Sequence, residues 1–469
     1  MRACAPYASL ESSERAGGIA FPLLLVYFVV AGAGLLVPLL NRPVLVLAPI
    51  GLAAAFMLVA RRMDLGIYLL IASTAFNRYN FEVAGWNAKV ENIVLLVVLT
   101  AWALRVTSGR DRAQRLPFAL LIGLFLLTNV LSSVMNSADV YKSMRIVVRM
   151  TLAVALFYLI FGYVSDRAKL LAALRALLIT GAGACAFGVG ALIVWHLNGW
   201  DVGVQHDPIT GVVSAKGTLW EGNIFGSYAA GIAVLSGSLL VSRAPTLQRG
   251  LLSVVFVLAM AALIMSLTRA AWVAFAAAAV LAVVFLRGVR LRTALLVTGM
   301  AAVALTLVFR FDLGGVPDDV SARFATLSAI RSDTNTVSRL KNIDLGLDEW
   351  RSKPLLGWGT DGFHINHPEI LSALPSPQLA TLYDTGIVGL VLFAGLVGAL
   401  LFHSVRASAR AGDEQVGAML GALTIAAVAQ LVAFQATDAF WLGFIWVYFG
   451  LMMGAVRLLE KGTRVEDCD

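Results

Sequence analysis

LLAALRALLITGAGACAFGVGALIVWHL, residues 170–197, is the stretch that decides the fold class. Its only Lys, Arg, Asp or Glu is Arg175, and about 20 mainly apolar helical residues cross a hydrocarbon core about 30 Å thick. Such stretches recur along the 469-residue chain, which is 59% hydrophobic and 14% charged. Helices satisfy their own backbone in lipid, and the strict alternation of barrel strands is missing. The sequence therefore predicts an all-α, polytopic transmembrane helical bundle.

Hydropathy marks about fourteen candidate spans, and a count nearer twelve is open because the third and fourth are short. The candidates are Ile19–Leu40, Pro43–Ala60, Leu65–Phe76, Ile93–Leu104, Leu116–Met135, Ile146–Val164, Leu170–Leu197, Ile224–Leu240, Leu251–Ser266, Ala270–Phe285, Ala294–Phe309, Leu379–Phe402, Val416–Phe434 and Trp441–Val456. They divide the chain into an N-terminal transmembrane region (1–197), a central transmembrane region (198–310), a large external loop (311–378) and C-terminal helices (379–469).

Alternate connections between the spans are basic, which predicts how the chain lies in the membrane. Basic groups near Arg61, Arg105, Arg167, Arg243, Arg287, Arg406 and Arg457 all fall on one side if both termini are cytoplasmic. The connections Asn77–Asn92, Asn198–Asn223 and Phe311–Gln378 then lie outside the cytoplasmic membrane. In the last of these, Val337–Trp350 places Leu340, Ile343, Leu347 and Trp350 on one helical stripe, which predicts an amphipathic helix on the outer membrane surface.

Cations are more frequent on the predicted outer side than the positive-inside rule leads one to expect. Arg145 and Arg149 lie one helical turn apart at the start of a span, and Arg269 interrupts an apolar run. Lys216 and Arg339 add to the set. Arginine forks onto phosphate oxygens, so the group favours a lipid diphosphate, although pairing with loop acids or lipid headgroups is the simpler alternative. The net charge of +8 does not indicate nucleic-acid binding, because no soluble basic domain carries it.

Candidates for a general base lie in the same outer segments. His364 and His367 are three residues apart beside Asp361 and Glu369, and Glu221 precedes a span as a competing carboxylate. The spacing is weak as a metal site, and inert surface histidines or a helix cap are the alternatives. Gly357–Gly362 is expected to form a turn and not a nucleotide loop, and no cofactor is expected.

An ordered series of motifs resembles the O-antigen ligase and polymerase family between about Lys216 and Phe402. It comprises KGTLWEGN from Lys216, SLTRAAW from Ser266, Arg339, PLLGWGTDGF from Pro354 and DTGIVGL from Asp384. The resemblance implies a metal-independent, inverting glycosyltransferase that moves a glycan from undecaprenyl diphosphate to a glycan, lipid or protein acceptor. It also implies that Arg269 and Arg339 grip the diphosphate.

One departure from the family pattern affects the predicted activity. Counting back from Gly386, the position of the usual family histidine is Pro375, followed by Ser376. His367 or His364 would have to take its place, and this shifts weight from ligase toward polymerase. A transporter or flippase of a lipid-linked saccharide and a catalytically inactive scaffold are the alternatives, although no inverted repeat is apparent.

Overall fold

The computed structural model describes residues 55–78, 80–83, 86–110, 114–206, 212–242, 247–285, 334–370 and 374–466. The predicted spans Ile19–Leu40 and Ala294–Phe309, most of Pro43–Ala60 and the first part of the predicted external loop lie outside these residues. The domain boundaries therefore stay a prediction.

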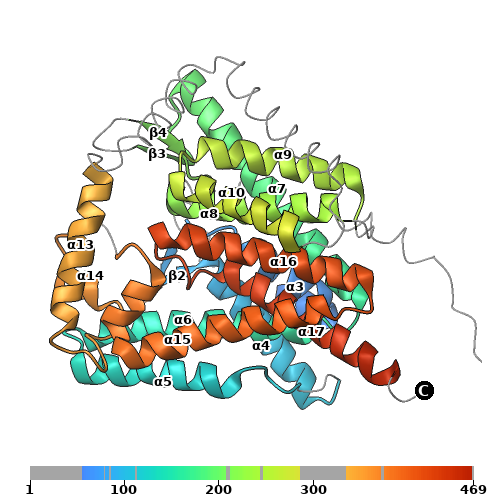
Figure 1. The fold of residues 1–469 in the computed structure, drawn as a ribbon, viewed down its shortest axis with the longest axis horizontal. Helices are drawn as coiled ribbons and strands as arrows, with labels where there is room; N and C mark the ends of the chain where they lie inside the picture. The colour runs from blue at the N-terminus through green and yellow to red at the C-terminus, as the bar shows by residue number, and fades with distance from the viewer. Residues whose placement is uncertain are drawn as a thin grey trace, which may run out of the picture.

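The described residues are predominantly helical, as predicted (Figure 1). Within the described ranges, eight helices are long and apolar enough to cross a membrane, and three shorter ones are also apolar. These helices are α3 Met63–Ser73, α4 Val90–Thr107, α5 Ala119–Asn136, α6 Val140–Tyr163, α7 Arg167–Asn198, α8 Gly222–Val241, α9 Arg249–Met265, α10 Arg269–Phe285, α15 Pro377–Ala409, α16 Glu414–Ala433 and α17 Gly443–Glu466. Each predicted span that lies wholly within the described residues corresponds to one of them, so the fold class is confirmed.

The longer connections gather at one end of the bundle, here called the loop end. Its described residues are 74–78, 80–83, 86–89, 198–206, 212–221, 334–370 and 374–376. Two antiparallel hairpins occur there, β1 Asn80–Val83 with β2 Trp86–Lys89 and β3 Val204–His206 with β4 Val213–Ala215. Helices α13 Thr334–Trp350 and α14 Gly362–Asn366 lie at the same end, on the left of Figure 1. The hairpins were not predicted. They leave the all-α class intact because each has only two short strands.

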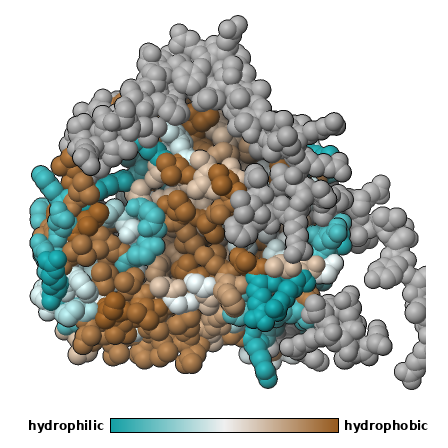
Figure 2. Space-filling view, viewed as in Figure 1, coloured by the Kyte–Doolittle hydropathy of each residue, from teal (hydrophilic) through white to brown (hydrophobic). Residues whose placement is uncertain are grey.

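Helix α13 confirms the helix that was predicted from Val337 to Trp350, but a different face of it packs on the protein. Asn342 and Gly346 are buried, and Leu345 contacts the small apolar cluster of Phe363, Leu374 and Tyr383. Leu340, which heads the predicted stripe, is 54% exposed. Hydrophilic side chains colour the edge of the molecule at α13, whereas apolar ones cover the middle of the bundle (Figure 2).

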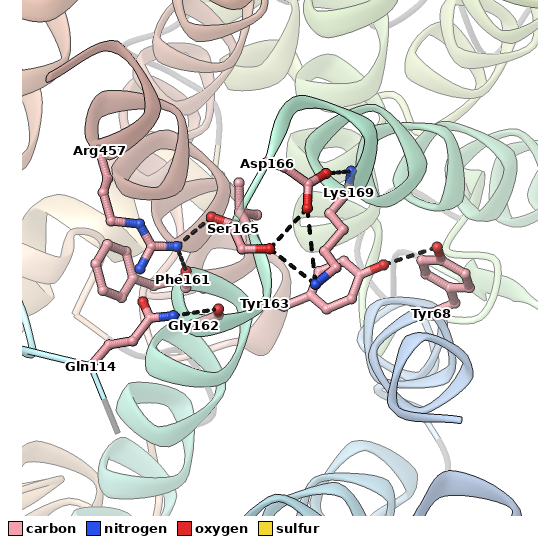
Figure 3. Close-up of polar contacts among 10 residues, drawn as sticks. Tyr68, Gln114, Phe161, Gly162, Tyr163, Ser165, Asp166, Lys169 and Arg457 are labelled. Carbon is pink, nitrogen blue, oxygen red and sulfur yellow. Dashed lines mark hydrogen bonds and ion pairs between the residues drawn. The ribbon is translucent and has the colours of Figure 1, made fainter. Parts of the chain in front are cut away.

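The opposite end of the bundle, here called the basic end, is held by polar contacts at the α6–α7 connection (Figure 3). Asp166 accepts a hydrogen bond from the Lys169 amide at 3.0 Å and so caps α7. Arg457 of α17 donates to the carbonyl of Phe161 at 2.9 Å and to that of Val164. A basic side chain therefore joins the last turn of α6 to α17.

Helix α8 forms the centre of the bundle. All of its residues except Asn223 are buried, and α8 packs against α9, α10 and α16. Its small residues Gly226 and Gly231 allow close approach, since a Cβ at Gly231 would lie 2.2 Å from the Gln430 amide of α16. Because Glu221 is the N-cap residue of α8, this packing fixes the position of Glu221 at the loop end.

Candidate functional site

Helix α15 is broken at Gly386, and a glycine-rich turn fills the break. Gly386 has φ +66°, ψ −164°, so the helical hydrogen bonds are interrupted there. The Trp358 and Gly359 amides donate to the carbonyls of Tyr383 and Asp384, each at 2.9 Å, and the Ile387 amide donates to Pro354 at 2.9 Å. The segment Gly357–Gly362 is therefore the predicted turn, and its role is to pair the backbone groups that the break leaves open.

The Asp384 side chain fixes the end of that turn. Its carboxylate accepts hydrogen bonds from the Asp361 amide at 2.8 Å and the Gly362 amide at 3.0 Å. Thr360 is fully buried, and its hydroxyl lies 3.0 Å from Asn129 Oδ1 of α5 and 3.1 Å from the Ser133 hydroxyl. Asp361 is thus held at a defined position beside α5 and the break in α15.

Replacing Gly386 with alanine is expected to destabilise the fold strongly. The positive φ costs a residue with a Cβ about 1–3 kcal/mol, and the new Cβ would lie 2.3 Å from the Leu355 backbone. We expect the melting temperature in detergent to fall by roughly 5 °C or more. Gly398→Ala is the control in the same helix, because a Cβ there meets no atom within 4 Å. Equal melting temperatures for the two variants would contradict this account.

Five titratable side chains lie near one another at the loop end and are here called the polar centre. They are Arg145, Arg149, Asp361, His364 and Asp438. His364 Nδ1 lies 2.7 Å from Asp361 Oδ1. Arg149 of α6 is within electrostatic range of both Arg145 and Asp361. Asp438, in the connection between α16 and α17, is within range of Asp361 and His364. Three separate segments thus supply one site that contains two cations, two acids and an imidazole.

The environment shifts the titration of two of these groups. The hydrogen bond that His364 donates to Asp361 raises the pKa of His364 above its ordinary value, against a smaller effect of reduced hydration. Reduced hydration within the surrounding protein, together with the nearby Asp361 carboxylate, raises the pKa of Asp438 to about 6. Both groups therefore exchange protons in the range where acid–base catalysis at neutral pH operates.

Glu221 and Arg269 adjoin the same connection. Glu221 Oε1 accepts a hydrogen bond from the Thr437 hydroxyl at 2.8 Å, and Thr437 directly precedes Asp438. Thr268 donates to the carbonyl of Gly222 at 3.0 Å, which holds the half-buried Arg269 at the start of α10 next to the start of α8. The first turns of α8 and α10 therefore meet beside the polar centre.

Lys216 and Arg339 occupy other parts of the loop end. Burial, followed by the nearby Arg78, lowers the pKa of Lys216, and Asp201 acts in the opposite direction. Lys216 thus belongs to the contact between the two hairpin connections, where the Arg78 amide donates to the carbonyl of Thr218 at 3.1 Å. Arg339 lies in α13, which packs on α15.

His367 is not directed toward His364. Its Nε2 lies 2.9 Å from Glu349 Oε1, its Nδ1 lies 3.5 Å from Glu369, and its side chain is 17% exposed against 44% for His364. Tyr383 donates to the other Glu349 oxygen at 2.5 Å. Both imidazole nitrogens of His367 thus face carboxylates within the packing of α13 on α15.

The position of the family histidine lies at the start of α15. Ser376 is the N-cap residue of this helix and accepts from the Leu379 amide at 3.3 Å. Pro375 precedes it and has no proton-accepting side chain. A histidine base therefore has to come from another segment. Within the described ranges, no three His, Cys, Asp or Glu side chains are grouped in a way that could hold a metal ion.

Comparison with known families agrees with this geometry. Residues 254–403 match the model of a family described as O-antigen ligase. The matched range contains Arg269, Arg339, His364 and the break at Gly386, and it confirms the resemblance that the order of motifs predicted. No curated protein matches the chain. The fold is that of a multi-pass membrane protein, and the match makes residues 254–403 similar to an O-antigen ligase domain, which supports a glycosyl-transferring enzyme.

The sequence did not single out Asp361, Asp384 and Asp438 as site residues. Asp361 and Asp384 lie within the quoted motifs, so position in a motif was the available signal. Asp438 lies in a short connection that is distant from the other site residues in sequence and close to Asp361 and His364 in the fold.

Proposed function

We propose that the chain transfers a glycan from an undecaprenyl diphosphate carrier to an acceptor hydroxyl at the outer face of the cytoplasmic membrane. The observation that carries this proposal is the pairing of the O-antigen ligase match with a polar centre at the loop end, where Arg149, Asp361 and His364 meet. The donor class follows from the cations, because a diphosphate leaving group needs positive charge to stabilise it.

The proposed orientation places the loop end outside and the basic end in the cytoplasm. Arg61, Arg105, Arg167, Arg406 and Arg457 belong to the ends of helices or to connections at the basic end, and short cytoplasmic connections retain Lys and Arg. Both termini would then be cytoplasmic. The polar centre would face the compartment in which lipid-linked glycans are joined.

The reaction is a single displacement at the anomeric carbon of the donor sugar. The acceptor oxygen forms a bond to this carbon while the bond from the carbon to the diphosphate oxygen breaks, which inverts the configuration. The electron pair of the broken bond stays on the diphosphate, where Arg145 and Arg149 stabilise it. Arg269, Arg339 and Lys216 are further candidates for this role, and the recognised neighbours of Lys216 are Arg78 and Asp201.

His364 is the best placed of the candidate bases. Asp361 accepts the Nδ1 proton, which leaves Nε2 free to take the proton of the acceptor hydroxyl. Glu221 is the second candidate, although one of its oxygens already accepts from Thr437. His367 is the third, since both of its nitrogens face carboxylates. The proposed catalysis needs only these side chains.

Replacing Asp361 with asparagine is expected to shift the pH dependence of transfer. A base works in its neutral form, so the wild-type rate should fall as the pH drops through the raised pKa of His364. Without the carboxylate this pKa falls, so the acid limb should move to lower pH while the maximal rate decreases. Rates measured from pH 5 to 9 test this, and an acid limb that stays in place would argue against His364 as the base.

A reconstituted assay distinguishes ligase from polymerase. Purified protein in liposomes receives undecaprenyl diphosphate-linked oligosaccharide, alone or with a separate lipid acceptor. A ladder of longer glycans on the carrier would identify a polymerase, which the proline at position 375 favours, and transfer to the separate acceptor would identify a ligase. Failure to form either product would reject the enzyme proposal.

The flippase alternative gains no support from the break in α15. Broken helices in transporters commonly leave backbone groups for ions or substrates. Here the carbonyls of Tyr383 and Asp384 already accept from Trp358 and Gly359. The break instead serves to hold Asp361 in place.

A further inference from the structure

A small cavity lies beside Arg149 at the loop end, where α4, α6 and the start of α17 meet. Lys89, Glu91, Asn92 and Arg149 form its polar wall, and apolar side chains that include Trp441 form the other. Trp441 is held in place by stacking on Phe125 and Trp446, with ring centroids 5.5 and 5.3 Å apart. The cavity therefore has one rigid apolar wall opposite a wall of hydrogen-bonding groups.

Glu91 is a buried carboxylate in the wall of this cavity, and one of its oxygens can accept a hydrogen bond from a ligand. Its side chain is 8% exposed, and among the described residues Oε2 has no hydrogen-bond partner. Gly443 lies directly against it, since a Cβ at Gly443 would come within 2.9 Å of Oε2. The Gly443 amide acts on this carboxylate, and Lys89 and Arg149 lie within electrostatic range of it. A buried carboxylate oxygen without an aligned donor is costly, so a group that donates to Oε2 from the cavity stabilises it.

Arg149 connects this cavity to the polar centre. It lines the cavity, and it is within electrostatic range of both Glu91 and Asp361. Arg149 is therefore the residue that the polar centre and the cavity share, and a ligand bound to it lies next to both. Phosphate oxygens have no proton to offer Glu91, so the part that enters the cavity must be a neighbouring group with hydroxyl or amide protons.

We propose that the cavity recognises the sugar that is bonded directly to the donor diphosphate, with Glu91 accepting a hydrogen bond from a hydroxyl or amide group of that sugar. This inference rests on the proposed function. In a glycosyl diphosphate this sugar is bonded directly to the phosphate, and Glu91 lines the same cavity as Arg149, which is assigned to the phosphate. Lys89 and Asn92 supply further hydrogen-bonding groups. The cavity has a volume of about 30 Å³, so a hydroxyl or amide group of the sugar enters it while the ring stays at its mouth. Glu91 is thus a residue that sets donor specificity.

Binding measurements on the full-length protein in detergent test this assignment. The probes are undecaprenyl diphosphate and the same lipid that carries one N-acetylhexosamine or one hexose. Wild-type protein should bind one glycosylated probe roughly tenfold more tightly than the bare diphosphate, as expected for one hydrogen bond to a charged group. In Glu91→Gln this preference should fall below roughly threefold, with bare diphosphate bound as in wild type.

Glu414→Gln is the matched control, because Glu414 is an exposed acid at the basic end. Retained binding of bare diphosphate shows that Glu91→Gln is folded. A preference that survives in Glu91→Gln, or wild-type protein that binds the bare and glycosylated lipids equally, overturns the inference. If Glu91→Gln binds all three probes more weakly by the same factor, the inference is also overturned. Glu91 would then affect diphosphate binding through Arg149 and would not recognise the sugar. If wild-type protein binds none of the probes, the proposed function itself fails.

Discussion

Arg149→Ala is expected to lower kcat/KM for the lipid-linked donor by roughly 100-fold or more, because the arginine would no longer stabilise charge on the leaving diphosphate. Arg149 lies within electrostatic range of Asp361 in the polar centre and of Glu91 in the adjoining cavity. Arg149→Lys should restore the activity only in part, since an ammonium group lacks the planar fork of a guanidinium group. The measurement is the initial rate of glycan transfer in proteoliposomes.

Arg110→Ala is the control for the Arg149 prediction. Arg110 is exposed at the basic end, just after α4. Its loss should leave the rate within about twofold of wild type, as for most surface substitutions. If Arg149→Ala were as active as Arg110→Ala, the polar centre would not be the diphosphate site.

His364→Ala is expected to lower kcat by roughly 10²–10⁴-fold while donor binding stays close to the wild-type value, as for loss of a general base. His367→Ala should instead retain most of the activity and lower the melting temperature, because His367 contacts Glu349, which also binds Tyr383. The two variants each remove one imidazole, at positions three residues apart, so each is a control for the other. The reverse pattern, with His367→Ala inactive and His364→Ala active, would assign the base to His367.

The helices could be predicted from the sequence because burial in lipid leaves a direct signal in hydropathy. Even the short apolar stretches near Leu65 and Ile93 correspond to α3 and α4. The hairpins could not be predicted, because strands of three or four residues depend on pairing across the connection, such as Val83 with Trp86. The packing face of α13 was also missed, because Asn342 and Gly346 are buried against neighbours that apolar periodicity does not reveal.

The candidate site could be predicted in part. Arg145 and Arg149 share a helix, so their spacing indicated that they act together. The spacing of three between His364 and His367 could not show which of the two faces the polar centre. Helix α14 ends at Asn366, and His367 is its C-cap with φ −126°, so the two imidazoles separate. Asp438 reaches the polar centre through tertiary packing alone.

The most direct test of the central claim follows both products of one turnover in proteoliposomes. The donor carries one label on the glycan and another on the undecaprenyl chain, and an acceptor is supplied on the outer side. The account predicts that free undecaprenyl diphosphate appears in equal amount to the glycan on the acceptor, and that Arg149→Ala and His364→Ala suppress both. Movement of intact donor across the bilayer without release of undecaprenyl diphosphate would contradict it and would identify the chain as a flippase.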